Sequence, residues 1–323
     1  MDYNNSQIQS DMRAVLLPSI GDPFALKFWL HCFEKWGKNV DKVYVSIGPR
    51  DGKYQEVIDY AKELLKDFQF VGTGEEMNTA FNDLLTNPMP EETFLLIQDD
   101  AYIFDPGIVD ASFRSIEEGW TDIVASNQYT YPDWLNDYIT PFLSPKDAQQ
   151  ANRGLAYYPN FFFGRVKEVQ DTKSGIRVQQ WPAGSNEYLH NMVLKQTADM
   201  DLMAALSLEL RSKGLRWQYI PQYQDGYWEQ WKDKKIPWTH VTGLSAIWNG
   251  IQSGINKENP NAYPHNIMLQ RLTWHVLFYE MFEMKEIQWF ADEYKKVIDQ
   301  IMQVSGVTRE ELEPRIRYFK ELL

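Results

Sequence analysis

Two adjacent carboxylates follow a short apolar run in the segment EETFLLIQDDAYIFDPG, residues 91–107. A hard divalent cation such as Mg²⁺ or Mn²⁺ is typically bound by one or two protein carboxylates together with phosphate oxygens of a substrate. Successive side chains of a strand point to opposite faces, so Asp99 and Asp100 can both reach one cleft only if the chain turns there. One acid is therefore the expected metal ligand. The structural alternative is a turn cap with an ion-paired neighbour.

A second pair of acids, Asp199 and Asp201, opens the segment ADMDLMAALSLELRSKGLRWQYIP. The pattern places them before or at the start of a helix, where acids satisfy free N–H groups and complement the helix dipole. Helix capping alone would explain them. The functional alternative is that one carboxylate projects from the helix N-terminus into a cleft and acts as a general base.

The elements that must position these acids alternate between strand and helix. Apolar runs at 14–17, 43–47 and 94–97, with a short FQFVG run between the last two, are separated by stretches with helical apolar spacing. This order predicts an α/β fold with a mostly parallel sheet covered by helices on both faces. Ligands of open α/β sheets bind beyond the carboxyl ends of the strands, and Asp99 and Asp100 lie at such an end.

The second half of the chain has a different composition. Residues 129–198 are rich in aromatics and prolines, and we expect a loop-rich wall of a cleft there, with most of the aromatic rings, including Phe161 to Phe163, in the core. The Gly/Asn/Pro-rich segment 249–266 is predicted to be a linker, and residues 267–323 a helical extension.

Composition limits the classes of function. The net charge of −13 and a pI near 4.9 argue against a broad electrostatic grip on nucleic acid or on an anionic membrane. The N-terminus has no apolar core of a signal peptide, no window approaches 18 consecutive apolar residues, and Cys32 is the single cysteine. We therefore expect a soluble cytoplasmic protein without a membrane span.

Four segments in order, AVLLPSIGDP, GTGEEMNTAFNDLL, LLIQDDAYI and ADMDLMAALSLELRSKGLRWQYIP, resemble nucleotide-sugar-dependent glycosyltransferases of the GT-A fold, most closely the inverting type. The resemblance implies that Asp100 binds the metal that bridges the donor diphosphate. Gln98 stands where the family usually has an acid contacting the donor ribose, and it can still hydrogen-bond hydroxyls without adding charge. Asp99 is a secondary candidate for binding the donor.

The same resemblance implies a general base and a further metal ligand. Asp199 corresponds to the family's base, but Ala198 replaces the usual Glu before it, so Asp201 stays open as an alternative. His240, in PWTHVTGLSAIWNG, is the candidate for the histidine that many such enzymes add to the metal site, and a hydrogen-bonded structural histidine is the alternative.

The resemblance also implies a donor site and a division of the chain. Expected contacts to the nucleotide come from Pro18, Ser19, Asp22, Ser46, Gly48 and Asn78, in addition to Gln98 and Asp99. Residues 1–248 would form the catalytic domain, with a nucleotide-sugar half at about 1–128 and an acceptor half at 129–248.

The expected function is metal-assisted transfer of a sugar from a nucleoside-diphosphate sugar, with a UDP-sugar favoured, to an acceptor hydroxyl. The cofactor would be Mn²⁺ or Mg²⁺. A glycan, a lipid-linked sugar, a protein or a modified nucleobase would serve as acceptor, and the oligomeric state stays open. Three alternatives remain: a retaining glycosyltransferase, a sugar nucleotidyltransferase of the same fold, and a non-catalytic glycan-binding relative.

Overall fold

The computed structural model gives the arrangement of most of the chain. It describes residues 12–48, 54–72, 77–127, 157–172, 179–181, 198–200, 206, 210, 213–221, 223, 228–241 and 265–323.

The centre of the molecule is a seven-stranded sheet with the strand order β10-β6-β7-β4-β1-β2-β3. Its strands are β1 (Arg13–Ser19), β2 (Lys42–Ile47), β3 (Gln69–Phe70), β4 (Thr93–Leu96), β6 (Ile123–Asn127), β7 (Tyr157–Arg165) and β10 (Trp217–Ile220). All neighbouring strands are parallel except β7, which runs antiparallel to both β4 and β6. Two small antiparallel sheets join β5 (Ala101–Ile103) to β11 (Trp238–His240) and β8 (Gln179–Trp181) to β9 (Ala198–Met200).

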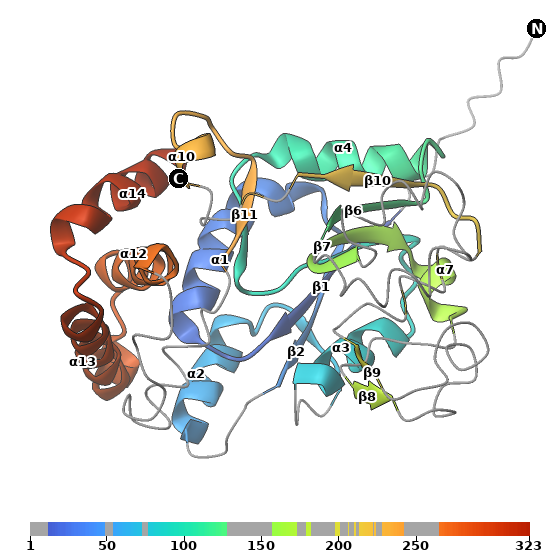
Figure 1. Cartoon of the computed structure of the whole chain (residues 1–323). Helices are drawn as coiled ribbons and strands as arrows, with labels where there is room; N and C mark the ends of the chain where they lie inside the picture. The colour runs from blue at the N-terminus through green and yellow to red at the C-terminus, as the bar shows by residue number, and fades with distance from the viewer. Residues whose placement is uncertain are drawn as a thin grey trace, which may run out of the picture.

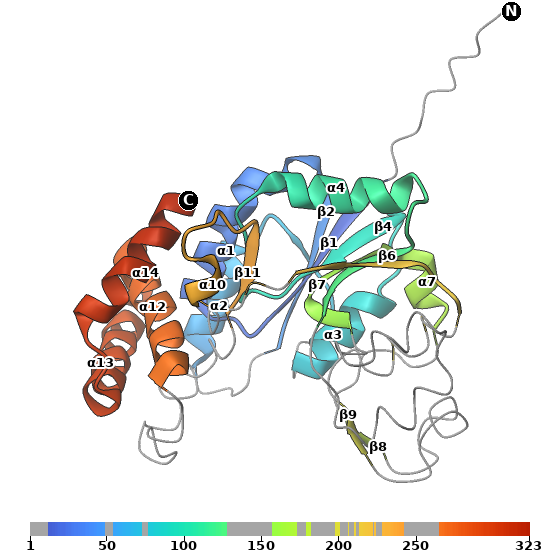
Figure 2. The same cartoon turned by 45° about the horizontal axis from the view of Figure 1, so that its top comes forward.

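Helices cover both faces of the sheet (Figures 1 and 2). One face packs on α1 (Pro23–Trp36), α2 (Gln55–Leu64) and α4 (Pro106–Glu117), and the other on α3 (Met77–Thr86) and α7 (Val166–Gln170). The predicted fold class, α/β with a mostly parallel sheet flanked by helices, is confirmed. No helix within the described ranges has the length and apolar character needed to cross a membrane.

The direction of chain progression reverses between β1 and β4. From β1 the chain proceeds outward through β2 to β3, whereas β4 lies on the opposite side of β1. The adjacent strands β1 and β4 are therefore the point at which the strand order of the sheet switches. In open α/β sheets such a switch point is where ligands bind.

Helix α1 follows the short loop at the end of β1. Asp22 is its N-cap, accepting hydrogen bonds from the backbone N–H groups of Phe24 (2.9 Å) and Ala25 (3.4 Å), and Pro23 occupies the first turn. The preceding Gly21 has a φ of +82°, and a Cβ there would lie 2.7 Å from the Cδ1 of Ile58. The helix ends at its C-cap Gly37, whose backbone N–H donates to the Phe33 carbonyl.

Strand β7 corrects the expectation of a loop-rich wall across residues 129–198. It is a central strand, and Phe161, Phe162 and Phe163 are fully buried between helices on both faces. A strand buried on both faces has no polar alternation, so its sequence reads only as an aromatic run. The expectation that these rings belong to the core is confirmed.

The C-terminal helices α12 (His265–Met281), α13 (Gln288–Ser305) and α14 (Arg309–Leu322) pack against the outer side of α1 (Figure 1). Phe24 lies 4.3 Å from Tyr294 and Phe28 lies 5.6 Å from Trp274, measured between ring centroids. The predicted linker lies outside the described residues except for its last two, which begin α12. The helical extension thus shares one continuous apolar core with α1.

The first prediction concerns the buried cap Asp22. Burial raises the pKa of this carboxyl from 3.8 to about 6, against the two cap hydrogen bonds that lower it. Between about pH 4 and pH 6 the folded state holds a proton that the unfolded state has lost, so the free energy of unfolding falls as pH rises. Asp22→Asn keeps the cap oxygen without the charge, and it should raise the free energy of unfolding at pH 7 by up to about 3 kcal/mol.

Urea unfolding at pH 4 and pH 7 measures this effect. The matched control is Asp105→Asn at the exposed cap of α4, where we expect a change below about 0.5 kcal/mol. A lower stability of the Asp22→Asn variant at pH 7 would contradict the prediction.

Candidate functional site

The chain turns at the end of β4, as two acids in one cleft would require. The backbone N–H of Ala101 donates to the carbonyl of Gln98 at 3.1 Å and closes a turn over Asp99 and Asp100. Asp99 is directed into the core: its Oδ2 accepts hydrogen bonds from the Ser19 hydroxyl and from the backbone N–H of Ile20 (3.3 Å). The two acids therefore occupy different environments.

Asp99 is a buried carboxyl, 3% exposed. Burial, followed by the nearby charge of Asp100, holds the pKa of Asp99 well above its ordinary value, while the hydrogen bond from Ser19 acts in the opposite direction. Ser19 is also fully buried, and its hydroxyl accepts a hydrogen bond from the N–H of Gly21 at 2.9 Å. The structure pairs these two side chains with each other, and their contact with a nucleotide stays a prediction.

Asp100 meets His240 at the outer end of this turn. Strand β11 pairs antiparallel with β5 so that His240 is opposite Ala101, and the N–H of Val241 donates to the Asp100 carbonyl at 2.9 Å. This pairing brings the His240 Nε2 to 3.4 Å from the Asp100 Oδ2. The other carboxylate oxygen, Oδ1, is buried and has no hydrogen-bond partner among the described residues.

This pair fits two protein ligands of one divalent cation. A separation of 3.4 Å is long for a hydrogen bond between a ring nitrogen and a carboxylate. Two ligand atoms each about 2.1 Å from a cation are about 3.0 Å apart at a right angle and about 3.4 Å apart at a tetrahedral angle. Within the described residues no group of three or more His, Cys, Asp or Glu side chains could hold a metal, so the remaining ligands would come from substrate and water.

The strand-end residues predicted to contact the nucleotide lie at the same edge of the sheet as Asp100. Pro18 and Ser46 are register partners at the ends of β1 and β2, and the N–H of Gly48 donates to the Ser19 carbonyl at 2.8 Å. Gln98 is half-buried after β4. Asn78 lies in the first turn of α3, and its side chain is outside the described part of the structure.

The candidate base Asp199 lies in strand β9, paired with Gln180 of β8 and ahead of the helical residue Leu206. Asp201 lies outside the described residues. Figures 1 and 2 both draw β8 and β9 apart from β11. The structure thus brings Asp100 and His240 together, and the role of Asp199 stays a prediction.

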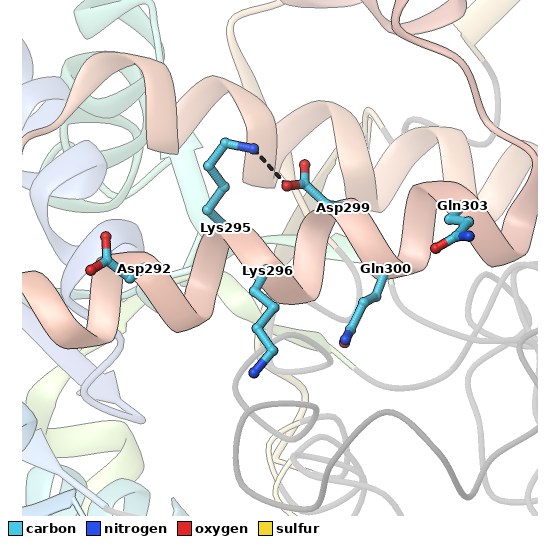
Figure 3. Close-up of a pocket in the computed structure, with 6 residues that line it drawn as sticks. All are labelled: Asp292, Lys295, Lys296, Asp299, Gln300 and Gln303. Atoms are coloured by element: carbon cyan, nitrogen blue, oxygen red, sulfur yellow. Dashed lines mark hydrogen bonds and ion pairs between the residues drawn. The ribbon is translucent and has the colours of Figure 1, made fainter.

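A separate hollow of about 330 Å³ lies along α13. Figure 3 shows that its lining comes from that one helix, including an ion pair between Lys295 and Asp299 at 2.6 Å. Figures 1 and 2 place α13 among the C-terminal helices, away from the sheet. Groups from one exposed helix face do not converge on a substrate, and we do not assign this hollow a role in the site.

The sequence analysis missed two buried polar residues at the carboxyl edge of the sheet. Asn160 is 1% exposed and Ser126 is fully buried, and neither the Asn160 Oδ1 nor the Ser126 Oγ has a hydrogen-bond partner among the described residues. The only signal in the sequence is an asparagine directly before three phenylalanines, where an apolar residue would be expected.

The fold and the site define an α/β protein with a carboxylate–imidazole pair at the switch point of its sheet. No protein-family model and no curated protein matches the chain. Among solved structures it is similar to mannosyltransferase PcManGT from Pyrobaculum calidifontis in complex with GDP-Man and Mn²⁺, with 8% identity, a TM-score of 0.43, and coverage of 92% of this chain and 73% of that chain.

Two further similarities have comparable values. S. aureus TarS 1-349 gives 12% identity and a TM-score of 0.39, covering 97% of this chain and 90% of its own. Galactosyltransferase LgtC, in complex with donor and acceptor sugar analogs, gives 8% identity and a TM-score of 0.41, covering 94% of this chain and 100% of that chain. At TM-scores this low, the similarities do not identify which residues of this chain bind or react.

The second prediction tests the metal pair. Asp100→Asn removes the charge with little change in shape, and His240→Gln removes the imidazole, so each should weaken Mn²⁺ binding at least about tenfold. Electron paramagnetic resonance of free Mn²⁺ measures this affinity. The matched control is His265→Gln, an exposed histidine 3.1 Å from Glu311, which should bind Mn²⁺ as the parent protein does. Unchanged affinity in both site variants would remove the pair from this role.

Proposed function

We propose that the protein is a glycosyltransferase that moves a sugar from a nucleoside-diphosphate sugar to an acceptor hydroxyl with the help of a divalent cation. The observation that carries the proposal is the 3.4 Å approach of Asp100 and His240 near the switch point between β1 and β4. The order of the four resembling segments along the chain agrees with it.

In this proposal the residues at the carboxyl edge of the sheet have separate roles. Asp100 and His240 would hold Mn²⁺ or Mg²⁺, which when bound neutralises charge on a diphosphate leaving group. Pro18 and Ser46, at the ends of β1 and β2, would flank the nucleoside, and Gln98 would hydrogen-bond ribose hydroxyls. The Ser19–Asp99 hydrogen bond would hold the two loops at a fixed separation.

Asp199 is our proposed general base, taking the proton from the attacking hydroxyl of the acceptor. Attack on the face opposite the leaving group then inverts the anomeric carbon in a single displacement. Ala198, in place of an acid, means that the base must act without an acidic neighbour on that side. Asp201 is the alternative position for the same role.

A donor screen tests the proposed function. UDP- and GDP-sugars are incubated with the protein with and without Mn²⁺, nucleotide release is measured, and candidate acceptors are analysed by mass. We expect metal-dependent nucleotide release, with a UDP-sugar preferred. Metal-dependent release of pyrophosphate from a nucleoside triphosphate and a sugar phosphate would indicate a nucleotidyltransferase, and nucleotide binding without turnover would indicate a binding protein.

The third prediction concerns the base. Asp199→Asn should reduce transfer by about 10² to 10⁴-fold, because positioned general bases contribute on that order, while the Kd for the nucleoside diphosphate stays within about twofold. The control is Asp171→Asn on an exposed turn, which should transfer at the parental rate. Unchanged turnover of the Asp199→Asn variant would exclude Asp199 as the general base. The anomeric configuration of the product, measured by NMR, would distinguish inversion from retention.

A further inference from the structure

A row of side chains, three of them polar, follows at the carboxyl edge of the sheet, on the face that packs against α3. The last apolar row on that face is formed by register partners of four adjacent strands, Tyr44, Leu16, Leu96 and Phe162. Side chains on one face of a strand recur every two residues. Two residues further towards the carboxyl edge, the same face carries the register partners Ser46 and Pro18, and the alternation continued past Leu96 and Phe162 puts Gln98 and Asn160 next in the row.

The two ends of this row are buried polar groups that the protein itself leaves unused. Ser46 and Asn160 are each 1% exposed, and neither the Ser46 Oγ nor the Asn160 Oδ1 has a hydrogen-bond partner within the described ranges. Burying such a group without a partner costs about 1–3 kcal/mol, and natural proteins keep few of them. A ligand that supplies the missing hydrogen bonds would account for both.

Asn160 also lies in a pronounced irregularity of the sheet. Ala125 pairs with Phe162 and Asn127 pairs with Tyr157, so the single residue between them on β6 faces four residues, 158–161, on β7. Bulges of this kind redirect side chains and occur preferentially beside active sites. Here the bulge lies just beyond the end of β4, next to the turn that carries Asp100.

The position of Asn160 along the row indicates which part of a donor it would contact. Strands are spaced about 4.8 Å apart, so Asn160 lies about 5 Å from Gln98 and about 14 Å from Ser46 across the sheet. The nucleoside is proposed to lie over β1 and β2, and the diphosphate at Asp100. Asn160 lies on the far side of β4 from the nucleoside, where the transferred sugar would extend.

Resting on the proposed function, we propose that Asn160 is a specificity-determining residue for the transferred sugar. Its amide oxygen accepts a hydrogen bond from a sugar hydroxyl. Sites that hydrogen-bond a substrate hydroxyl with a buried polar group discriminate strongly against analogues that lack it. Asn160 therefore selects among sugars by the position of their hydroxyl groups, and the Ser46 end of the row contacts the nucleoside.

Calorimetry in the presence of Mn²⁺ tests this inference with UDP, UDP-glucose, GDP and GDP-mannose as probes. Asn160→Leu removes the polarity at similar volume, and Asn160→Ala is the second variant in case the first does not fold. For whichever sugar nucleotide the parent protein binds, we expect the Kd to rise about tenfold in either variant. The Kd for the corresponding free nucleotide should change less than about twofold.

The control is Asn39→Ala, whose exposed amide donates to Asp110 at 3.1 Å near the amino end of β1, and it should bind both probes as the parent protein does. Sugar nucleotide binding that is unchanged in the Asn160 variants would overturn the inference and leave the proposed function intact. An equal loss for free nucleotide and sugar nucleotide would also overturn it. A parent protein that binds none of the four probes would refute the proposed function, and the inference with it.

Discussion

The hydrogen bond between the Ser19 hydroxyl and the Asp99 carboxyl is the contact on which the geometry of the site depends. It joins the ends of the parallel strands β1 and β4, between which the progression of the chain across the sheet reverses. With Asp99 held inward, the turn that follows directs the next residue, Asp100, toward β11 and His240. A buried polar pair of this kind is costly to break, so the spacing of the two loops is fixed within the core.

The C-terminal helices support the same region from behind. The ring of Phe24, whose backbone N–H donates to the Asp22 cap, lies tilted against Tyr294 of α13. Phe28 of α1 contacts Tyr102 of β5 at 4.6 Å between ring centroids. Helix α1 is thus clamped between the strand that follows Asp100 and the helical extension. This arrangement gives the extension a physical role in positioning the start of α1, beyond adding apolar area.

Several features were predictable because they depend on neighbours in the sequence. The start of α1 follows from Asp22 and Pro23, and the start of α14 from the capping box of Thr308 and Glu311, which the structure contains. The order of strands and helices through β4 followed from apolar periodicity. By contrast, β7 was hidden in an aromatic-rich segment, because a strand buried on both faces carries no alternating pattern.

The sequence by itself determined the fold class and the order of elements through β4, because cap residues and apolar periodicity act over short range. The acids after β4 stood out by residue type, and the resemblance of the sequence segments added His240 as a candidate. Only the tertiary structure decided how they are used. Asp99 turns to Ser19, Asp100 meets a histidine 140 positions away, and the antiparallel register of β4 and β7 pairs Leu96 with Phe162, two residues after Asn160. Such relations depend on strand order and pairing between distant segments, which no local pattern specifies.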